Sequence, residues 1–181
     1  MKMKFKPSNL KVAVVSAIVV GSVGFNTATF AGTAGDNMAV TTDVGISCSI
    51  AVVDLDFGGY DPTYGVHHDA TGTVTSTCTL GGAVVLTLGQ GANADDSSST
   101  DAAPIRRMLG TTGAGTGTYL AYSLWQDSGR NTTVFGNTSG TGKSYTSAVG
   151  DDITTVYGRI PKEQSVATGS YVDSVSVTLT Y

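Results

Sequence analysis

The chain contains two histidines, and they stand side by side at positions 67 and 68. His67 and His68 follow Pro62 in a segment rich in Tyr, Gly and Asp, a composition typical of loops. No second pair of Cys or His lies at the spacing of a zinc site. We therefore expect both histidines to lie in a surface loop, without a catalytic role and without a bound metal.

Aspartates are the other residues that could act as acids or bind a cation. None of them falls in the D-x-[DN]-x-[DN]-G pattern of a calcium loop. The aspartates considered are Asp61, Asp69, Asp95, Asp96, Asp101, Asp151 and Asp152. Residues 136–144 superficially resemble a phosphate loop, but Asn137 stands where that pattern requires Gly. We therefore expect no enzyme, no metal and no cofactor.

An export signal occupies the start of the chain. Four lysines within residues 1–11 precede an apolar run at 12–23, which is too short to span a bilayer. The small-residue pattern Thr29-Phe30-Ala31 predicts cleavage before Gly32, with Ala34 as a second candidate site. We assign residues 1–31 to a secretory signal peptide.

The exported part is acidic. Four of the ten Lys and Arg residues lie in the signal and all fourteen acids lie beyond it, which leaves six bases, fourteen acids and a net charge of −8. No basic patch remains to meet phosphate, so we expect neither nucleic acid nor an anionic membrane as a partner. No later apolar run reaches the length of a membrane helix, so we expect no stable membrane insertion.

Two cysteines, Cys48 and Cys78, lie in the exported part. An oxidising compartment would pair them, and two buried free thiols are the alternative. On the chain-entropy model, closing a loop of about thirty residues stabilises the fold by roughly 3 to 4 kcal/mol.

Alternation of apolar and polar residues with period two recurs between Gly, Ser, Asn and Asp clusters, which predicts an all-β sandwich or small barrel. The candidate strands are 38–53, 71–80, 83–88, 119–126, 132–135, 154–160 and 171–181. Trp125 and several tyrosines suggest a carbohydrate-stacking face, but alternation places several of them inward. We therefore interpret Trp125 and Tyr119, Tyr122, Tyr157, Tyr171 and Tyr181 as core residues.

The two ends of the exported chain carry the clearest alternation. The last segment places one set of residues on a single face: Tyr171, Val175, Val177, Leu179 and Tyr181. The tail before the first cysteine does the same with Met38, Val40, Thr42, Val44 and Ile46. An exposed apolar edge requires a cover, and the tail of another subunit could supply it by β-strand addition. The alternative is that the tail forms the first strand of its own sheet.

A series of short motifs spans nearly the whole exported chain. In order they are Cys48, Leu55-Asp56-Phe57-Gly58-Gly59-Tyr60-Asp61-Pro62, 71–78, 107–109, 120–127, 134–136, 156–161 and 169–181. Their order and spacing resemble the spore coat protein U domain family, which includes the subunits of archaic chaperone-usher (Csu-type) pili.

The resemblance implies an incomplete immunoglobulin-like β-sandwich, residues 47–181, that lacks its final strand and carries the family's disulfide at Cys48 and Cys78. A periplasmic chaperone would hold it, an outer-membrane usher would export it, and a neighbour's N-terminal donor strand would complete it. The donor strand maps onto the tail, residues 32–46, with Met38, Val40, Thr42, Val44 and Ile46 pointing into the groove. The acceptor-groove edge maps onto Tyr171, Val175, Val177, Leu179 and Tyr181.

The resulting hypothesis is a structural subunit of an extracellular fimbria, exported through the periplasm to the cell surface and supporting adhesion and biofilm formation. Its partners would be copies of itself or related pilins. One alternative is a monomeric secreted adhesin or coat protein. A small outer-membrane β-barrel is a second alternative, which the cysteine pair and the few short strands disfavour.

Overall fold

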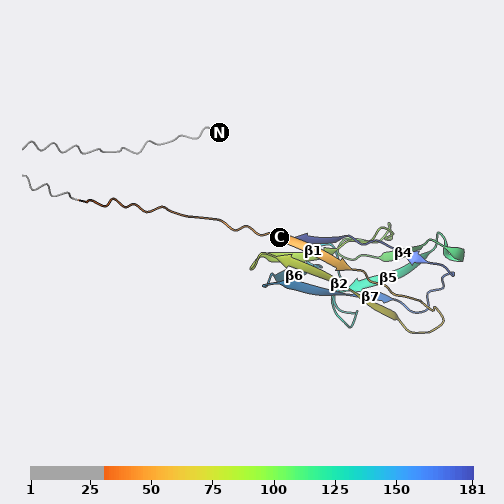
Figure 1. Cartoon of the computed structure of the whole chain (residues 1–181). Coiled ribbons are helices and arrows are strands. Elements are labelled where there is room, and N and C mark those ends of the chain that lie inside the picture. The colour runs from red at the N-terminus through yellow and green to blue at the C-terminus, as the bar shows by residue number, and fades with distance from the viewer. Residues whose placement is uncertain (1–30) are drawn as a thin grey trace, which may run out of the picture. The chain divides into compact units, whose positions relative to one another are not determined.

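The body of the protein is built from two antiparallel sheets that face each other (Figure 1). The computed structural model describes residues 31–181, so the signal peptide expected at 1–31 lies outside the described residues apart from Ala31. Residues 42–181 form one compact unit. In residues 31–181 no helix is long and apolar enough to cross a membrane.

The first sheet has six strands in the order β1-β2-β7-β5-β4-β8, and the second has three in the order β6-β3-β9. The strands of the first sheet are β1 (Cys48–Val53), β2 (His68–Cys78), β7 (Asp151–Ile160), β5 (Tyr119–Trp125), β4 (Arg106–Gly110) and β8 (Tyr171–Val172). The second sheet contains β6 (Lys143–Thr146), β3 (Ala83–Leu88) and β9 (Val177–Thr180). A short 3-10 helix, η1 (Gly113–Gly115), interrupts the loop between β4 and β5.

The predicted all-β sandwich is confirmed, and several predicted strand limits are corrected. Of the run 38–53 only 48–53 is a strand, because no strand of the described chain pairs with residues 38–46. The run 132–135 is reduced to one bridge between Trp125 and Val134. The last run is two strands, because residues 173–176 carry the chain from the first sheet to the second.

The core lies between the inner faces of the two sheets. Its buried members are Val74, Leu86, Leu88, Leu120, Tyr122, Leu124, Phe135, Val156 and Ile160. In β5 the inner face carries Leu120, Tyr122 and Leu124, so the alternate residues point outward. Our interpretation of Trp125, Tyr119 and Tyr157 as core residues is therefore wrong, whereas it holds for Tyr122 and, at the rim of the core, for Tyr171. The interpretation is also wrong for Tyr181, which is exposed.

The segment after β1 packs against the core. Leu55 and Phe57 pack against the core and lie over Gly158 of β7, where a Cβ atom would overlap both side chains. Gly158 leaves the space that these two side chains fill. The motif Leu55-Asp56-Phe57 thus packs two of its side chains onto β7.

An ion pair on the outer face of the first sheet gives a testable pH dependence. Arg159 of β7 donates two hydrogen bonds to Asp69 of β2, at 2.7 and 2.8 Å, and Arg130 lies 3.4 Å from the same carboxylate. The hydrogen bond from Arg159 lowers the pKa of Asp69 below 3.8. Because the pair is partly exposed, Asp69→Asn is expected to lower the free energy of unfolding at neutral pH by about 0.5 to 1 kcal/mol.

The sign of the pH effect follows from the lowered pKa. The contribution of Asp69 is complete above the ordinary carboxyl pKa and is lost as the pH falls through the folded-state value, below 3.8. The free energies of unfolding of Asp69→Asn and of the unchanged protein, measured in urea, should converge in strong acid. Asp151→Asn is the control, since Asp151 accepts a hydrogen bond from Thr77 and makes no ion pair in residues 31–181. A difference in the free energy of unfolding between Asp69→Asn and the unchanged protein that persists in strong acid contradicts the assignment.

Candidate functional site

An open groove with a volume of about 940 Å³ lies between the two sheets. Its floor consists of core side chains from the first sheet, among them Val74, Leu124 and Val156. Val52 of β1 lines it from the first sheet, and Val177 of β9 lines it from the second. The groove therefore opens onto the apolar core of the sandwich.

The two strands that border the groove each have a strand partner on one side only. Within the described chain β1 pairs with β2 alone and β9 pairs with β3 alone, so each is the outermost strand of its sheet. β9 ends one residue before the C-terminus, which lies at the end of the body where β1 begins (Figure 1), so β1 and β9 run in opposite directions. Each border thus presents a row of backbone N–H and C=O groups without a strand partner.

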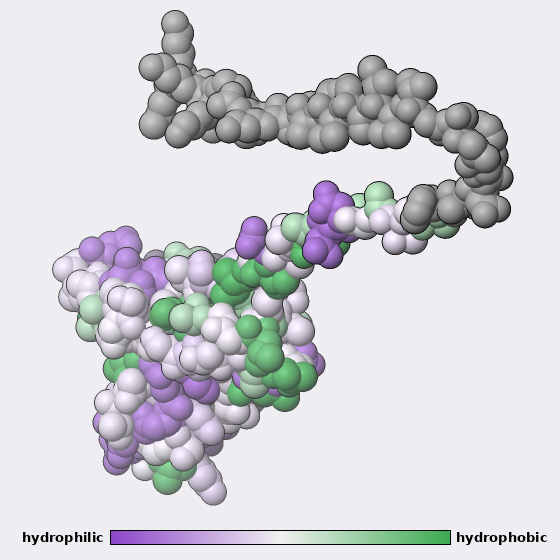
Figure 2. All heavy atoms as spheres, turned by 90° about the vertical axis from the view of Figure 1, so that its left-hand side faces the viewer, coloured by the Kyte–Doolittle hydropathy of each residue, from purple (hydrophilic) through white to green (hydrophobic). Residues whose placement is uncertain are grey.

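Apolar side chains on these borders are incompletely covered. Ile50 and Val52 stand opposite the buried Ser76 and Val74, so they face inward, yet they are 41% and 49% exposed. Figure 2 looks onto the end where β1 begins and shows hydrophobic residues, in green, grouped on the surface. A complete sandwich would bury inward-facing side chains of this kind.

The last segment shows the alternation predicted from the sequence. Tyr171, Val175, Val177 and Leu179 are partly buried against the core, while the residues between them, apart from Asp173, are exposed. Tyr181 is 56% exposed, because it lies beyond the last paired residue of β9. Four of the five residues expected along the groove edge therefore point inward.

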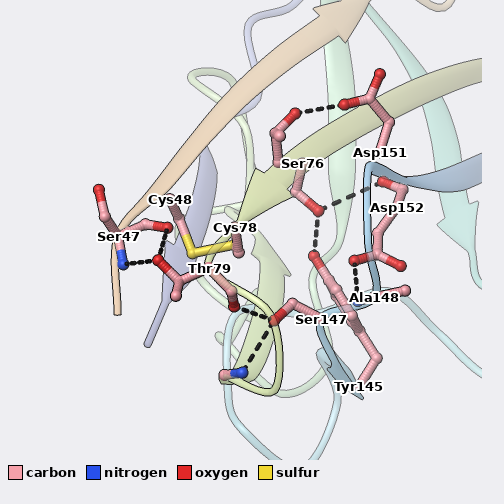
Figure 3. Close-up of a disulfide and its surroundings, with 12 residues drawn as sticks. Ser47, Cys48, Ser76, Cys78, Thr79, Tyr145, Ser147, Ala148, Asp151 and Asp152 are labelled. Atoms are coloured by element: carbon pink, nitrogen blue, oxygen red, sulfur yellow. Dashed lines mark hydrogen bonds between the residues drawn. A yellow bond between two sulfur atoms is a disulfide. The ribbon is translucent and has the colours of Figure 1, made fainter. Parts of the chain in front are cut away.

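The disulfide predicted between Cys48 and Cys78 is present, and it joins the first register pair of β1 and β2 (Figure 3). Beyond it the pairing continues by one residue, since the Thr79 N–H donates to the Ser47 carbonyl at 2.9 Å. The Ser47 N–H in turn donates to the Thr79 hydroxyl at 3.1 Å. We call residues 45–47 the tail root. Ile46 of the root packs against Gly82, where a Cβ atom would overlap it.

The tail before the root contains no strand within residues 31–44. Its alternating apolar residues are almost fully exposed, with Met38 at 87%, Val40 at 86% and Val44 at 80%. Thr42 is exposed as well. The tail thus carries an apolar pattern that no strand of its own sheets uses.

Comparison with known proteins gives the family. A model of the Spore Coat Protein U domain matches residues 34–178. The chain belongs to this family. Protein U of Myxococcus xanthus is 37% identical over 181 residues, which cover 95% of the present chain and 98% of Protein U. The family resemblance inferred from the sequence is confirmed.

Solved structures show a related fold. The domain matches a chain in the complex of the chaperone CsuC with the tip adhesion subunit CsuE, from the archaic chaperone-usher Csu pili of Acinetobacter baumannii, with a TM-score of 0.53 and 18% identity. The match covers 76% of the present chain and about 40% of that chain, and it is a likeness of fold. A looser match, with a TM-score of 0.40 and 18% identity, is HdaB, the minor tip subunit of the E. coli Hda pilus; it covers 72% of the present chain and 79% of HdaB.

A polar network in this Spore Coat Protein U domain includes two residues that line the groove, Tyr122 and Asp173. The Tyr122 hydroxyl donates to a carboxylate oxygen of Asp173 at 2.6 Å. Burial raises the pKa of Tyr122 well above its usual value, and the hydrogen bond to Asp173 raises it further. Arg106, the cross-strand neighbour of Tyr122, is buried, and desolvation lowers its pKa to about 10. This network was not predicted, because nothing in the adjacent pair Arg106-Arg107 distinguishes a buried arginine from an exposed one in the sequence.

The two histidines of the domain make structural contacts. His68 begins β2 and is partly buried between Phe57 and Tyr60, so the expectation of a surface loop is wrong for this residue. The Nδ1 atom of His67 accepts a hydrogen bond from the Lys162 N–H at 3.2 Å. Within residues 31–181 no three His, Cys, Asp or Glu side chains are grouped to hold a metal ion.

Proposed function

We propose that this chain is a structural subunit of an extracellular chaperone-usher pilus and that its groove accepts the N-terminal tail of a neighbouring subunit. The observation that carries the proposal is the apolar groove between two unpaired strand borders, in a chain whose own tail is an exposed alternating segment. A strand laid between β1 and β9 gives both borders main-chain hydrogen bonds, and its alternate side chains enter the groove.

The dimensions of the tail suit this role. Residues 38–46 cover eight residue steps, which is about 27 Å of extended chain at the usual rise per residue. Five inward positions then follow at every second residue: Met38, Val40, Thr42, Val44 and Ile46. The border strand β1 has six residues, and the border strand β9 has four. A segment of this length would therefore reach along the whole of β1.

The tail root favours donation to a neighbour over folding back. Ser47 extends the ladder between β1 and β2, and the Thr79 hydroxyl also donates to the Gly45 carbonyl at 3.4 Å. These contacts continue the line of β1 away from the groove. To fill its own groove the chain would have to reverse direction at residues 45 and 46, where Ile46 packs on Gly82.

The partners and route follow from the same proposal. A periplasmic chaperone would cover the groove before assembly, and an outer-membrane usher would pass the subunits to the cell surface. The signal at 1–31, the donor tail at 32–46 and the accepting domain at 47–181 are the three parts of this scheme. The fold shared with a subunit of the Csu pili supports it. Adhesion and biofilm formation are the activities of the assembled fibre under this proposal.

A second candidate function is a coat protein or adhesin that acts as a secreted monomer. The match of the Spore Coat Protein U domain to residues 34–178 favours the coat-protein part of this candidate. In that case the groove of each subunit would be filled by its own tail or left open, and no subunit would depend on a neighbour.

Peptide complementation tests whether the groove accepts the tail sequence, and sizing of the unchanged exported chain distinguishes the two candidates. The exported chain is prepared with Val40→Asp and Val44→Asp, a variant whose tail cannot fill an apolar groove; it is the parent chain for the experiments below. A synthetic peptide with the sequence of residues 36–47 should bind it saturably and raise its thermal midpoint. The same peptide carrying aspartate at both positions is the control and should do neither. A parent chain that binds no peptide contradicts the pilus proposal, and an unchanged exported chain that stays monomeric on sizing supports the monomeric candidate.

A further inference from the structure

The last segment changes sheets within the wall of the groove. β8 pairs with β4 in the six-stranded sheet, and β9 pairs with β3 in the three-stranded sheet. Residues 173–176 connect the two, and residues 173–175 and Val177 line the groove. The position of this crossing determines the line along which β9, one border of the groove, runs.

The side chain of Asp173 holds the crossing from two sides. One carboxylate oxygen accepts the hydroxyl of Tyr122 from β5, and the other accepts both the backbone N–H and the side-chain amide of Asn93, each at 3.1 Å. Gly91, with a φ of +92°, lies so close that a Cβ atom there would overlap the carboxylate. Asp173 therefore joins the first sheet to the loop that follows β3.

The backbone next to the Asp173 carboxylate departs from regular strand pairing. The Gly89 N–H donates to the Ser176 carbonyl at 2.8 Å, and the Ala92 N–H donates to the Ser174 carbonyl at 2.9 Å. Three residue steps on one strand thus face two on the other, as in a β-bulge, which bends and redirects the chain. Gly91, which has a positive φ, lies within this bulge and directly against Asp173.

Arg106 holds the end of β3 through hydrogen bonds to its backbone. Its guanidinium donates to the carbonyls of Leu88 and Gly89, at the end of β3, and to the carbonyl of Phe135. Arg106 and Tyr122 are cross-strand neighbours, so one strand pair holds both the end of β3 and the crossing. Asp173 already accepts three hydrogen bonds, which leaves it with a positioning role rather than a role in contacting the incoming strand.

We propose that Asp173, held by Tyr122 and Asn93, is the positioning residue of the groove: it sets the course of β9 relative to β1 and thereby the ability of the groove to accept a strand. The inference rests on the proposed function, since it names the residue that prepares the same groove for its occupant. The carboxylate is suited to this task because a neutral amide in its place would present one accepting oxygen instead of two.

The test measures binding of the peptide with the sequence of residues 36–47 to the parent chain described above. Asp173→Asn and Tyr122→Phe should each weaken the affinity by tenfold or more, because β9 is no longer held on its course. Asp151→Asn is the matched control, a carboxylate outside the groove that accepts a hydrogen bond from the Thr77 hydroxyl, and it should bind as the parent does.

A second control separates positioning from general destabilisation. Phe135→Leu loosens the core, and Phe135 does not line the groove. At a temperature well below its midpoint it should retain the parent affinity even when its midpoint falls as far as that of Asp173→Asn. Should Asp173→Asn fail to fold, Tyr122→Phe, which removes one hydroxyl, carries the test.

The outcomes are distinct for the two proposals. Peptide binding by the parent and equal binding by Asp173→Asn and Tyr122→Phe overturn the positioning role and leave the pilus proposal standing. Equal loss of affinity in Phe135→Leu and Asp173→Asn also overturns the positioning role. Absence of peptide binding by the parent overturns both.

Discussion

Deletion of residues 33–44 from the exported chain is expected to abolish fibre formation while leaving a folded subunit. The deleted residues contribute no strand to either sheet, and the root at 45–47 is kept, so the body retains all its sheet contacts. The polymer, by contrast, loses every inter-subunit strand. Purified exported chain should form ladders on a gel run without boiling, and the deleted chain should run as a single band.

Point substitutions keep the length of the tail and test which face of the strand enters the groove. Val40→Ser with Val44→Ser removes two apolar side chains from the face that would enter the groove, and it should reduce the ladder strongly. Ala39→Ser with Thr41→Ser changes the opposite face of the same strand and should leave the ladder intact, because successive side chains of a strand point to opposite faces. Equal behaviour of the two double variants would show that the tail does not act as a strand.

The deleted chain also tests the accepting half of the mechanism. It keeps its groove, so it should bind the terminal tail of an intact subunit and stop the growth of mixed fibres. Mixing it with intact chain in increasing ratio should shorten the ladder. Fibres of undiminished length at a large excess of the deleted chain would contradict acceptance of the tail in trans.

The sequence predicted the fold class, the disulfide and the family because each leaves a local or compositional signal. Period-two alternation identifies β3 at its observed limits, 83–88, and places β5, β7 and the last segment within a few residues. The cysteine pair follows from export and number alone. The apolar pattern of the tail is visible too, but it looks like a strand whether its partner lies in its own body or in another subunit.

The missed elements lack such a signal. β4 begins with Arg106 and Arg107, and a buried arginine breaks the apolar rhythm that marks a core strand. β6 is four residues long and follows a Gly-rich loop, so its alternation is too short to recognise. The network of Tyr122 with Asp173 joins residues 51 positions apart, and only the folded chain brings them together. The outward position of Trp125 depends on the phase set by Leu120 and Leu124, which the sequence leaves open.

Removal of the disulfide is expected to lower both the stability of the fold and the affinity of the groove for the tail peptide. Cys48 and Cys78 are 30 positions apart, and losing the link should lower the free energy of unfolding by roughly 3 to 4 kcal/mol on the chain-entropy model. Cys48→Ala with Cys78→Ala, compared with the parent by urea unfolding, measures this change. An unchanged midpoint and slope would contradict it.

The loss should be concentrated in β1, which is held by one strand neighbour while Ile50, Val52 and Val53 remain substantially exposed. Little apolar burial then opposes the opening of this strand, and β1 is one of the two borders of the groove. We therefore expect the cysteine-free chain to lose affinity for the tail peptide by more than its overall stability requires, and its β1 amides to exchange hydrogen faster than those of β5 and β7. Saturating peptide should restore part of the lost stability, because it binds only the state in which β1 is in place. A cysteine-free chain with parent affinity for the peptide and slow exchange in β1 would show that the ladder to β2 suffices to hold the border.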